Sequence, residues 1–432
     1  MKNLLESLFK LEENHTSIRT EITAGFTTFL TMAYIIVVNP AILSDAGMDF
    51  GAVFVATILA AVIGTTIMGL WANWPVALAP GMGLNAFFTY GVVLGMGHSW
   101  QLALGAVFWA GLLFLIISLT PLREWIINSI PKSLKLGIGA GIGFFLAIIG
   151  LKNAGFVVDH PVTLVTLGDL SSPPVLLAAL GFISMVVLNA YKVQGAIIFS
   201  IIGVSIIGGI LGITEFHGIV SAIPSIAPTL FHLDMIGVIE AGLIGLVFAF
   251  LFVDFFDTAG TLTSVANLSN QIDNKGNVKA IDKALLSDSS ATVVGAVLGT
   301  SNTTSYIESG AGVSAGGKTG LTAITVAVLF LFCLFLAPLA KSIPSFATAS
   351  ALIFVATFFA SNIKDIDWDD VTEYTPAIIA TIMMPLTFSI THGLTLAFIS
   401  YALIKLLSGR FSELPPAVAL VAVLSMLYYW LI

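Results

Sequence analysis

Apolar runs of close to twenty residues follow one another along almost the whole of this 432-residue chain. A helix needs about 20 apolar residues to cross the hydrocarbon core of a bilayer. Only 9% of the residues are charged and 57% are hydrophobic, whereas an ordinary globular domain carries about 25% charged residues. We therefore expect an all-α polytopic protein that crosses a lipid bilayer many times.

The runs predict fourteen transmembrane spans. Seven lie at 22–43, 51–71, 76–97, 100–119, 132–151, 172–190 and 193–213. Seven more follow at 236–262, 284–300, 301–316, 318–340 and 345–361, and in the stretch 374–408, which we divide into two near His392 and Gly393. The tail at 415–432 is a further apolar segment, either interfacial or spanning.

The N-terminal segment 1–21 mixes charges with Leu and Phe at helical spacing. This pattern favours an amphipathic helix at the membrane surface over a cleaved signal peptide. Lys2, Lys10 and Arg19 predict a cytoplasmic N-terminus, because cytoplasmic segments collect Lys and Arg. The net charge of −8 gives no reason to expect a nucleic-acid partner.

Two sets of seven spans predict an inverted repeat, an arrangement in which transporters bind their substrate where interrupted helices meet. The third span reads NWPVALAPGMGLNAFF from Asn73, and the tenth reads NTTSYIESGAGVSAGG from Asn302. An alignment that places Asn73 on Asn302 also places Gly81 on Gly310. Both segments contain helix-breaking residues, so we expect short interrupted segments in spans 3 and 10.

Residues 312–319, GVSAGGKT, match the phosphate-loop pattern G-x-x-x-x-G-K-[ST]. The match lies directly before an apolar run, where a nucleotide-binding domain has no room. The longest polar connection, about 263–283, is too short to supply such a domain. An ATP-driven membrane protein is therefore a remote alternative, and Lys318 is more simply a cytoplasmic anchor at the end of a span.

Acidic residues inside apolar spans are the strongest indication of function. Asp254 and Asp257 are three residues apart in the eighth span and share a helix face. Glu308 stands in the tenth span. An acid at the bilayer centre costs about 2.5 to 3.5 kcal/mol on insertion scales, so the three acids are expected to face an interior cavity.

Each of these polar residues also has a plainer interpretation. Asp254 could be a helix-packing acid, and Asp257 could cap or scaffold a helix end. Asn85, the lone amide of GLNAFF, could orient a ligand or satisfy the backbone of a broken helix. Asp288, at the start of the ninth span, is first an N-cap, a structural residue near the site.

Half-helices offer unpaired N–H groups and the acids offer acceptors, a combination that suits a flat heterocycle. Phe87, Phe88 or Tyr306 could stack on such a ligand, although each could equally be a packing residue. The six histidines show no metal-ligand spacing, and no nucleophile with a base is evident. We therefore expect no metal, no cofactor and no enzyme activity.

Three motifs together resemble one known family. GMGLNAFF in the third span, FVDFFDTAGTL in the eighth, and YIESGAGVSAGGKTGLTA in the tenth and eleventh are similar to the AzgA-like purine permeases of the nucleobase/ascorbate transporter superfamily. The resemblance covers nearly the whole chain. It implies a fold like that of the uracil transporter, with a core domain (22–120 and 236–340) and a gate domain (121–235 and 341–432), after a cytoplasmic segment at 1–21.

The resemblance also implies a function and a set of site residues. Asn85, Asp254 and Glu308 would bind substrate and couple it to protons, with Asp257 supporting the coupling. Glycines at 81, 83 and 310 would shape the interrupted spans. The expected activity is proton-coupled uptake of a purine nucleobase (adenine, guanine or hypoxanthine) through the inner membrane, by a homodimer.

The identity of the substrate stays open in part. The GMGLN motif is more like the adenine-type members, so adenine is the first expectation. The alternatives are another nucleobase, such as uracil or xanthine, and an anion. The acids argue against an anion, because a carboxylate repels one.

Overall fold

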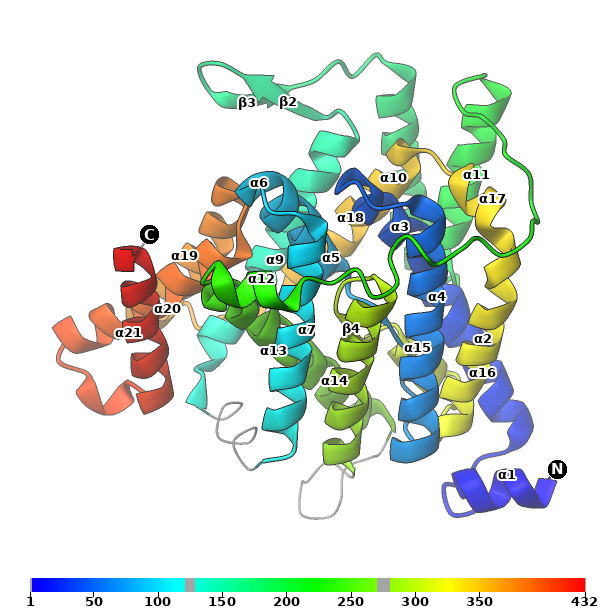
Figure 1. The fold of residues 1–432 in the computed structure, drawn as a ribbon, viewed down its shortest axis with the longest axis horizontal. Coiled ribbons are helices and arrows are strands. Elements are labelled where there is room, and N and C mark those ends of the chain that lie inside the picture. Colours follow the sequence, from blue (N-terminus) through cyan, green and yellow to red (C-terminus); the bar gives the residue numbers. More distant parts are fainter. Residues whose placement is uncertain (1, 121–128, 270–279, 432) are drawn as a thin grey trace.

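The computed structural model describes residues 2–120, 129–269 and 280–431, and most of them are helical (Figure 1). Helices suit this composition because a backbone inside a bilayer must satisfy its own hydrogen bonds. Within the described residues, nine helices are long and apolar enough to cross a membrane. The all-α polytopic fold is therefore confirmed, while the count of fourteen spans stays a prediction.

The elements of the first half follow the predicted spans, with the first, second and third spans each divided. They are α1 (Lys2–Phe9), α2 (Ile18–Met32), α3 (Ile35–Asp45), α4 (Phe50–Ile67), the π-helical turn η1 (Met68–Ala72), strand β1 (Leu78–Pro80), α5 (Met82–Ala86), the π-helical η2 (Phe87–Val93), α6 (Leu94–Met96), α7 (Trp100–Ser118), α9 (Lys132–Asn153), strands β2 (Val157–His160) and β3 (Leu164–Leu167), α10 (Pro173–Ala190) and α11 (Ala196–Ile210).

The second half repeats this order of long helices around one short, strand-containing segment. Its elements are α12 (Met235–Glu240), α13 (Ile244–Ser269), α14 (Ile281–Leu298), strand β4 (Thr303–Ser305), α15 (Ser309–Ser314), α16 (Gly320–Cys333), the 3₁₀ turn η3 (Leu334–Leu336), α17 (Ala337–Lys341), α18 (Ser345–Ala360), the 3₁₀ turn η4 (Ser361–Asp365), α19 (Val371–Thr387), α20 (Ile390–Leu407), the 3₁₀ turn η5 (Phe411–Glu413) and α21 (Pro416–Leu431).

The stretch 374–408 divides into α19 and α20, but slightly earlier than predicted. Phe388 ends α19 in the left-handed conformation, with φ 48°. The Ser389 hydroxyl then accepts the backbone N–H of His392 and caps α20. The predicted break near His392 and Gly393 is therefore wrong, because a side-chain cap sets a helix start and Ser389 provides it.

The predicted N-terminal helix is observed as α1, in which Leu4 and Leu8 are exposed and Phe9, at its end, is buried. Phe9 and Leu11 are buried together with Leu321 of α16. The Asn73 side chain donates to the Phe9 carbonyl oxygen at 3.1 Å, and its own oxygen accepts the N–H of Gly320 at 2.8 Å. The contact therefore joins three segments that are far apart in the sequence.

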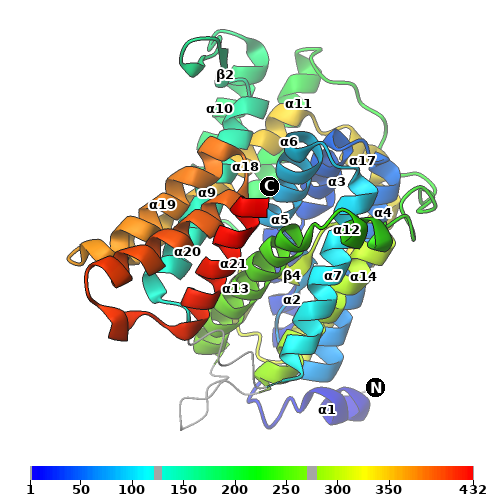
Figure 2. The ribbon, with the colours of Figure 1, turned by 60° about the vertical axis from the view of Figure 1, so that its left-hand side comes forward.

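The helices pack in two sets. Helix α9 packs most extensively against α18 and α19, and α10 packs against α11 and α18. Helices α2, α4, α7, α14 and α16 pack mainly with one another. Both views place α19 and α20 to one side of α7 and α14, while β2 and β3 project at the end opposite α1 (Figures 1 and 2). The expected domain boundary at residue 121 lies outside the described residues.

Candidate functional site

The two interrupted spans meet in the interior of the protein through a two-stranded antiparallel sheet. Strand β1 of the third span pairs with β4 of the tenth, and every residue of both strands is buried. The ladder continues where Gly81 donates its N–H to the Asn302 carbonyl and Tyr306 donates to the Ala77 carbonyl, each at 2.9 Å. Short interrupted segments in spans 3 and 10 are thus confirmed.

The predicted alignment, which places Asn73 on Asn302, does not superimpose the secondary-structure elements of the two interrupted segments. Strand β1 begins at Leu78 and β4 at Thr303, directly after Asn302. The short helices that follow begin at Met82 and Ser309. Strand β4 begins directly after Asn302, whereas β1 begins several residues after Asn73, and the connection to the next helix is longer after β4 than after β1. The matching glycines therefore gave the wrong alignment.

Gly81 and Gly83 stand where neighbouring groups come close. A Cβ atom on Gly81 would lie 2.9 Å from Thr304 Cγ2 of β4. One on Gly83 would lie 2.7 Å from Ile142 Cγ2 of α9. Side chains at these positions would therefore push β1 away from β4 and α5 away from α9.

Asp254 of α13 is buried beside the strand pair, with 1% of its surface exposed. Its Oδ2 atom accepts hydrogen bonds from Thr292 Oγ1 at 2.8 Å and from Asn302 Nδ2 at 3.0 Å. Its Oδ1 atom has no hydrogen-bond partner among the described residues. Asp254 is therefore held in place by one oxygen and keeps an acceptor for another group.

Asp288 is not the N-cap that the sequence suggested. It lies in the middle of α14, and Ala280 occupies the N-cap position. Asp288 Oδ2 accepts the Ser305 backbone N–H at 2.7 Å and the Ser305 hydroxyl at 2.6 Å. Thr258 Oγ1 donates to Oδ1 at 2.7 Å. Asp288 therefore fixes the end of β4 against α13 and α14.

Glu308 directly precedes α15 and is partly exposed. Tyr34, at the turn between α2 and α3, donates its hydroxyl to Glu308 Oε1 at 2.7 Å. Asp257 is also partly exposed, nearly one turn beyond Asp254 on α13. It is close enough to interact electrostatically with both Asp254 and Glu308. The predicted acids therefore gather where α13 meets α15.

Asn85 is fully buried on α5 and donates to Asn39 Oδ1 at 2.9 Å. Asn39 in turn donates to Thr57 Oγ1 at 2.7 Å and to Thr300 Oγ1 at 2.9 Å. Asn85 Oδ1 has no partner in the part of the chain that the structure describes. The Asn85 amide thus donates to the side chain of Asn39, and its own oxygen remains an unused acceptor.

The predicted stacking residues are engaged in packing. Phe87 is fully buried, with its ring centroid 5.0 Å from that of Phe250. The Tyr306 hydroxyl donates to the Pro80 carbonyl at 2.5 Å, which ties β4 to the end of β1. Phe88 is buried as well. Stacking of any of them on a ligand stays a prediction.

The glycines of α15 differ in their surroundings. A Cβ on Gly312 would lie 2.0 Å from Thr28 Oγ1 and 2.6 Å from the Ala24 carbonyl oxygen of α2. One on Gly310 would meet only Leu268 Cδ1 at 3.3 Å. The close approach of α15 to α2 therefore depends on Gly312, while the tenth span tolerates a small side chain at Gly310.

The phosphate-loop match forms the turn between α15 and α16, and its backbone N–H groups are already bonded. The carboxylate of Glu21, which is fully buried, accepts the N–H of Lys318 at 3.0 Å and that of Thr319 at 3.2 Å. Thr322 Oγ1 donates to the same carboxylate at 2.6 Å. A phosphate loop offers such N–H groups to a nucleotide, and here a side chain of α2 takes them.

Several residues of the site were missed in the sequence. Tyr34 and Asn39 lie in the first span, in the run TMAYIIVVNP, where a phenol and an amide interrupt apolar residues. Thr292 and Asn302 hold Asp254 from α14 and from the start of β4. Asn39 could have been found by the rule that flagged the acids, because a buried amide also needs partners.

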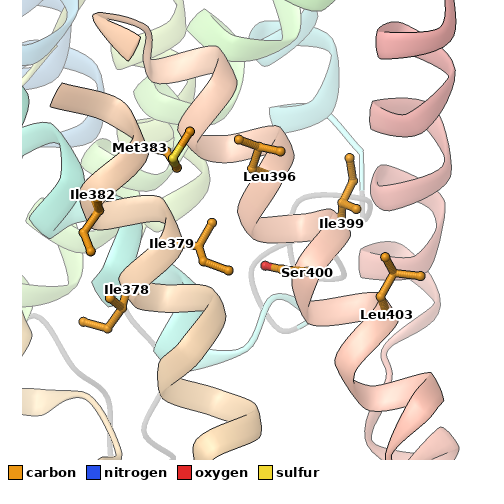
Figure 3. Close-up of a pocket in the computed structure, with 8 residues that line it drawn as sticks. All are labelled: Ile378, Ile379, Ile382, Met383, Leu396, Ile399, Ser400 and Leu403. Carbon is orange, nitrogen blue, oxygen red and sulfur yellow. The ribbon is translucent and has the colours of Figure 1, made fainter. Parts of the chain in front are cut away.

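A groove of about 330 Å³ lies between α19 and α20, away from the acids (Figure 3). Its lining is apolar apart from one serine: Ile378, Ile379, Ile382, Met383, Leu396, Ile399, Ser400 and Leu403. Apart from the Ser400 hydroxyl, which donates to the Ala397 carbonyl, no polar or charged side chain of this lining could orient a polar ligand. The described residues also include no group of three or more His, Cys, Asp or Glu side chains that could hold a metal ion.

Comparison with known proteins places the sequence among permeases. The pattern that defines the Permease family (Xan_ur_permease) matches residues 19–396. The chain is 48% identical over 426 residues to adenine permease AdeP of Escherichia coli, covering 99% of this chain and 96% of that protein. It is 45% identical to guanine/hypoxanthine permease PbuO of Bacillus subtilis, covering 96% and 98%.

Solved structures share the fold at low sequence identity. The transmembrane domain of the cyanobacterial bicarbonate transporter BicA superposes with a TM-score of 0.67 at 16% identity, covering 88% of this chain and 97% of that chain. SLC26A9 superposes with a TM-score of 0.65 at 10% identity, covering 94% and 69%. The predicted all-α transporter fold class is thereby confirmed.

Proposed function

The chain belongs to the Permease family, and from that premise we propose that it is a secondary active transporter that takes up purine nucleobases together with protons. Two relatives with 45% identity or more are named as an adenine permease and a guanine/hypoxanthine permease, which supports a purine substrate. The GMGLN motif favours adenine among them. Multi-pass membrane insertion follows from the apolar helices.

The observation that carries the proposal is a set of buried oxygen acceptors without partners at the crossing of the two interrupted spans. Oδ1 of Asn85, Oδ1 of Asp254 and Oδ1 of Asn302 all lack a hydrogen-bond partner within the described residues. A buried polar atom left unpaired costs free energy, so a ligand that supplies donors is favoured. Adenine and guanine offer ring and exocyclic N–H donors along the edges of one flat ring system.

Two carboxyl groups of the site have different roles in this proposal. Asp254 is anchored by Thr292 and Asn302 and accepts an N–H of the purine through its remaining oxygen. Glu308, which is partly exposed, takes up the proton, with Asp257 beside it. Protonation removes the cost of enclosing a negative charge, so purine and proton together favour closure of the site.

Alternating access is proposed to move the core domain against the gate domain. The core comprises 22–120 and 236–340, and the gate comprises 121–235 and 341–432. The separate packing of α9, α18 and α19 supports this division.

The N-terminus is proposed to be cytoplasmic and the membrane the inner one. A homodimer is proposed from the resemblance alone. The protein is not proposed to be an enzyme.

The proposal can be tested with detergent-purified protein and a panel of adenine, guanine, hypoxanthine, uracil and bicarbonate. A ligand that binds only the folded protein raises its stability, by about 2.7 kcal/mol at 100 times Kd. We expect a purine to raise the melting temperature, adenine most, and Glu308→Gln to weaken this. Glu215→Gln, an exposed acid, is the matched control. Stabilisation by bicarbonate or uracil alone would reject the purine assignment.

Coupling is tested in proteoliposomes that contain no nucleotide. An imposed inward proton gradient should drive purine accumulation, and a protonophore should abolish it. Accumulation driven by an inward Na⁺ gradient at constant pH would contradict proton coupling, and accumulation that requires ATP would contradict secondary transport.

A further inference from the structure

Tyr34 lies at a break in the first span, where α2 ends at Met32 and α3 begins at Ile35. Its side chain is 1% exposed. The hydroxyl donates to Glu308 Oε1 at 2.7 Å across 274 positions of sequence. The break therefore places a buried phenol against the partly exposed carboxyl group of the tenth span.

Tyr34 is the only side chain within the described residues that hydrogen-bonds the carboxyl group of Glu308. Thr31 donates to the Thr28 carbonyl of its own helix at 2.8 Å and reaches only the main-chain carbonyl of Glu308, at 3.4 Å. The Tyr306 hydroxyl, which is nearby in sequence, donates instead to the Pro80 carbonyl. Besides its own backbone N–H, the Glu308 carboxyl group is therefore oriented by one phenolic hydroxyl.

The other titratable groups around Glu308 cannot replace that bond. Helix α15 packs against α2 and α13. From these elements and the adjoining turns, Tyr34, Tyr306 and Asp257 interact electrostatically with Glu308, and Asp254 lies close to Asp257. Two of these are acids and none is a base. Only a hydroxyl donor can thus stabilise a charge on Glu308 there.

We propose that Tyr34 is a positioning residue, which holds the Glu308 carboxyl group in one orientation and sets the pH range over which the site takes up its proton. Tyr34 acts through Glu308, because the bond that its hydroxyl donates goes to the Glu308 carboxyl group. The part that concerns transport rests on the proposed function, whereas the contact with Glu308 does not.

The test compares Tyr34→Phe with Tyr306→Phe. Each variant removes one buried hydroxyl and keeps the ring, but only the first removes a bond to the carboxyl group. Infrared spectra of the purified protein at low pH give the C=O band of protonated Glu308, identified by its loss in Glu308→Gln. We expect Tyr34→Phe to move this band to higher frequency, since the carbonyl oxygen loses a donor, and Tyr306→Phe to leave it in place.

The pH profile of purine uptake is the second readout. A hydrogen bond to a charged group is strong enough to move a titration by about one pH unit. In Tyr34→Phe the ionised form loses its donor, so half-maximal uptake should move to higher pH by about that amount. Tyr306→Phe should lower the rate of uptake without moving the profile.

The outcomes separate this inference from the proposed function. If neither variant moves the infrared band, or if both move it equally, the role of Tyr34 is rejected. A parent protein that transports no purine rejects the proposed function, while the infrared result still decides the contact. Should Tyr34→Phe fail to fold, 3-fluorotyrosine at position 34 replaces it. Its more acidic hydroxyl should move the band to lower frequency, and an unchanged band would count against the inference.

Discussion

At the scale of single residues, the buried acids differ in how far their oxygens are occupied. Asp288 has both oxygens bonded, by Ser305 and Thr258. Asp254 has one bonded oxygen and one unused. Because unused acceptors favour a ligand and satisfied ones favour rigidity, the structural role of Asp288 is distinguished from the ligand contact proposed for Asp254.

Replacement of Asp288 should therefore lower the free energy of unfolding more than replacement of any exposed acid. Asp288→Ala leaves the Ser305 N–H and two hydroxyls without their acceptor, and each unsatisfied buried group costs about 1 to 3 kcal/mol. We expect the melting temperature to fall by several degrees, and Asp288→Asn to cost less. Glu240→Ala, at an exposed position, is the control. Equal melting temperatures for the two alanine variants would contradict the role assigned to Asp288.

Asp370 predicts a response to acid outside the spans. The Thr372 hydroxyl and backbone N–H donate to its carboxylate and, with Arg410 beside it, lower its pKa to about 2. The ordinary pKa of Asp is about 3.9. A lowered pKa means that the ionised form stabilises the fold. This contribution is complete above pH 4 and is lost as the pH falls toward 2.

We expect Asp370→Asn to be less stable than the parent at pH 6 and to lose less stability between pH 4 and pH 2. Melting temperatures across that range measure the effect. Asp169→Asn is the control. The Ser171 hydroxyl lowers the pKa of Asp169, which is exposed, and no arginine contributes to this shift. Parallel curves for the parent and Asp370→Asn would contradict the prediction.

At the scale of elements, the short helix α15 is held by backbone contact. Its neighbour α2 approaches closely because Gly312 carries no side chain. The turn after α15 is tied to α2 a second time through Glu21. These contacts place Glu308, at the start of α15, within reach of Tyr34.

Gly312→Ala should displace α15, since the new methyl group would meet Thr28 Oγ1 and the Ala24 carbonyl. Overpacking of this kind costs about 1 to 3 kcal/mol. We expect a lower melting temperature and weaker stabilisation by purine. Gly310→Ala, on the same helix but with only Leu268 nearby, should change both much less. The same loss in both variants would mean that the close contact with α2 is not the cause.

At the scale of the whole molecule, few polar contacts among the described residues join the set of helices around α9 to the rest. Asn153, at the end of α9, donates to the Tyr90 hydroxyl at 2.7 Å. Tyr90 of η2 donates to Asp45 Oδ2 at 2.6 Å. Strand β2, which follows α9, and helix α6, which follows η2, lie at the end opposite α1 (Figure 1). Under the proposed topology this end is the outer face of the protein. Opening of the site to the outside would have to break the bond between Asn153 and Tyr90.

Asn153→Ala should therefore shift the protein toward the state that is open outward. A hydrogen bond contributes about 1 kcal/mol, which corresponds to about a fivefold change in population. The half-saturating concentration of external purine should fall by up to that factor. Lys152→Ala, which removes an exposed neighbour, is the control. An unchanged half-saturating concentration in Asn153→Ala would show that this bond does not hold the outer face closed.

The sequence by itself determined the membrane class, and it singled out three acids as candidates, because bilayer thickness and the cost of a buried charge act on local runs of residues. Ser389 as the cap of α20 could also have been read locally. The role of Asp288 could not, because its main partner Ser305 lies on a strand that forms only when two distant spans pair.

Only the tertiary structure decided which groups complete the site. The register of β1 with β4, the bond from Tyr34 to Glu308 and the capture of the GVSAGGKT turn by Glu21 each join segments from opposite halves of the chain. Periodicity and spacing describe neighbours along a chain. Hydrogen-bond partners across such distances are selected by the packing of whole helices, and that packing separates a structural acid from one left free to bind.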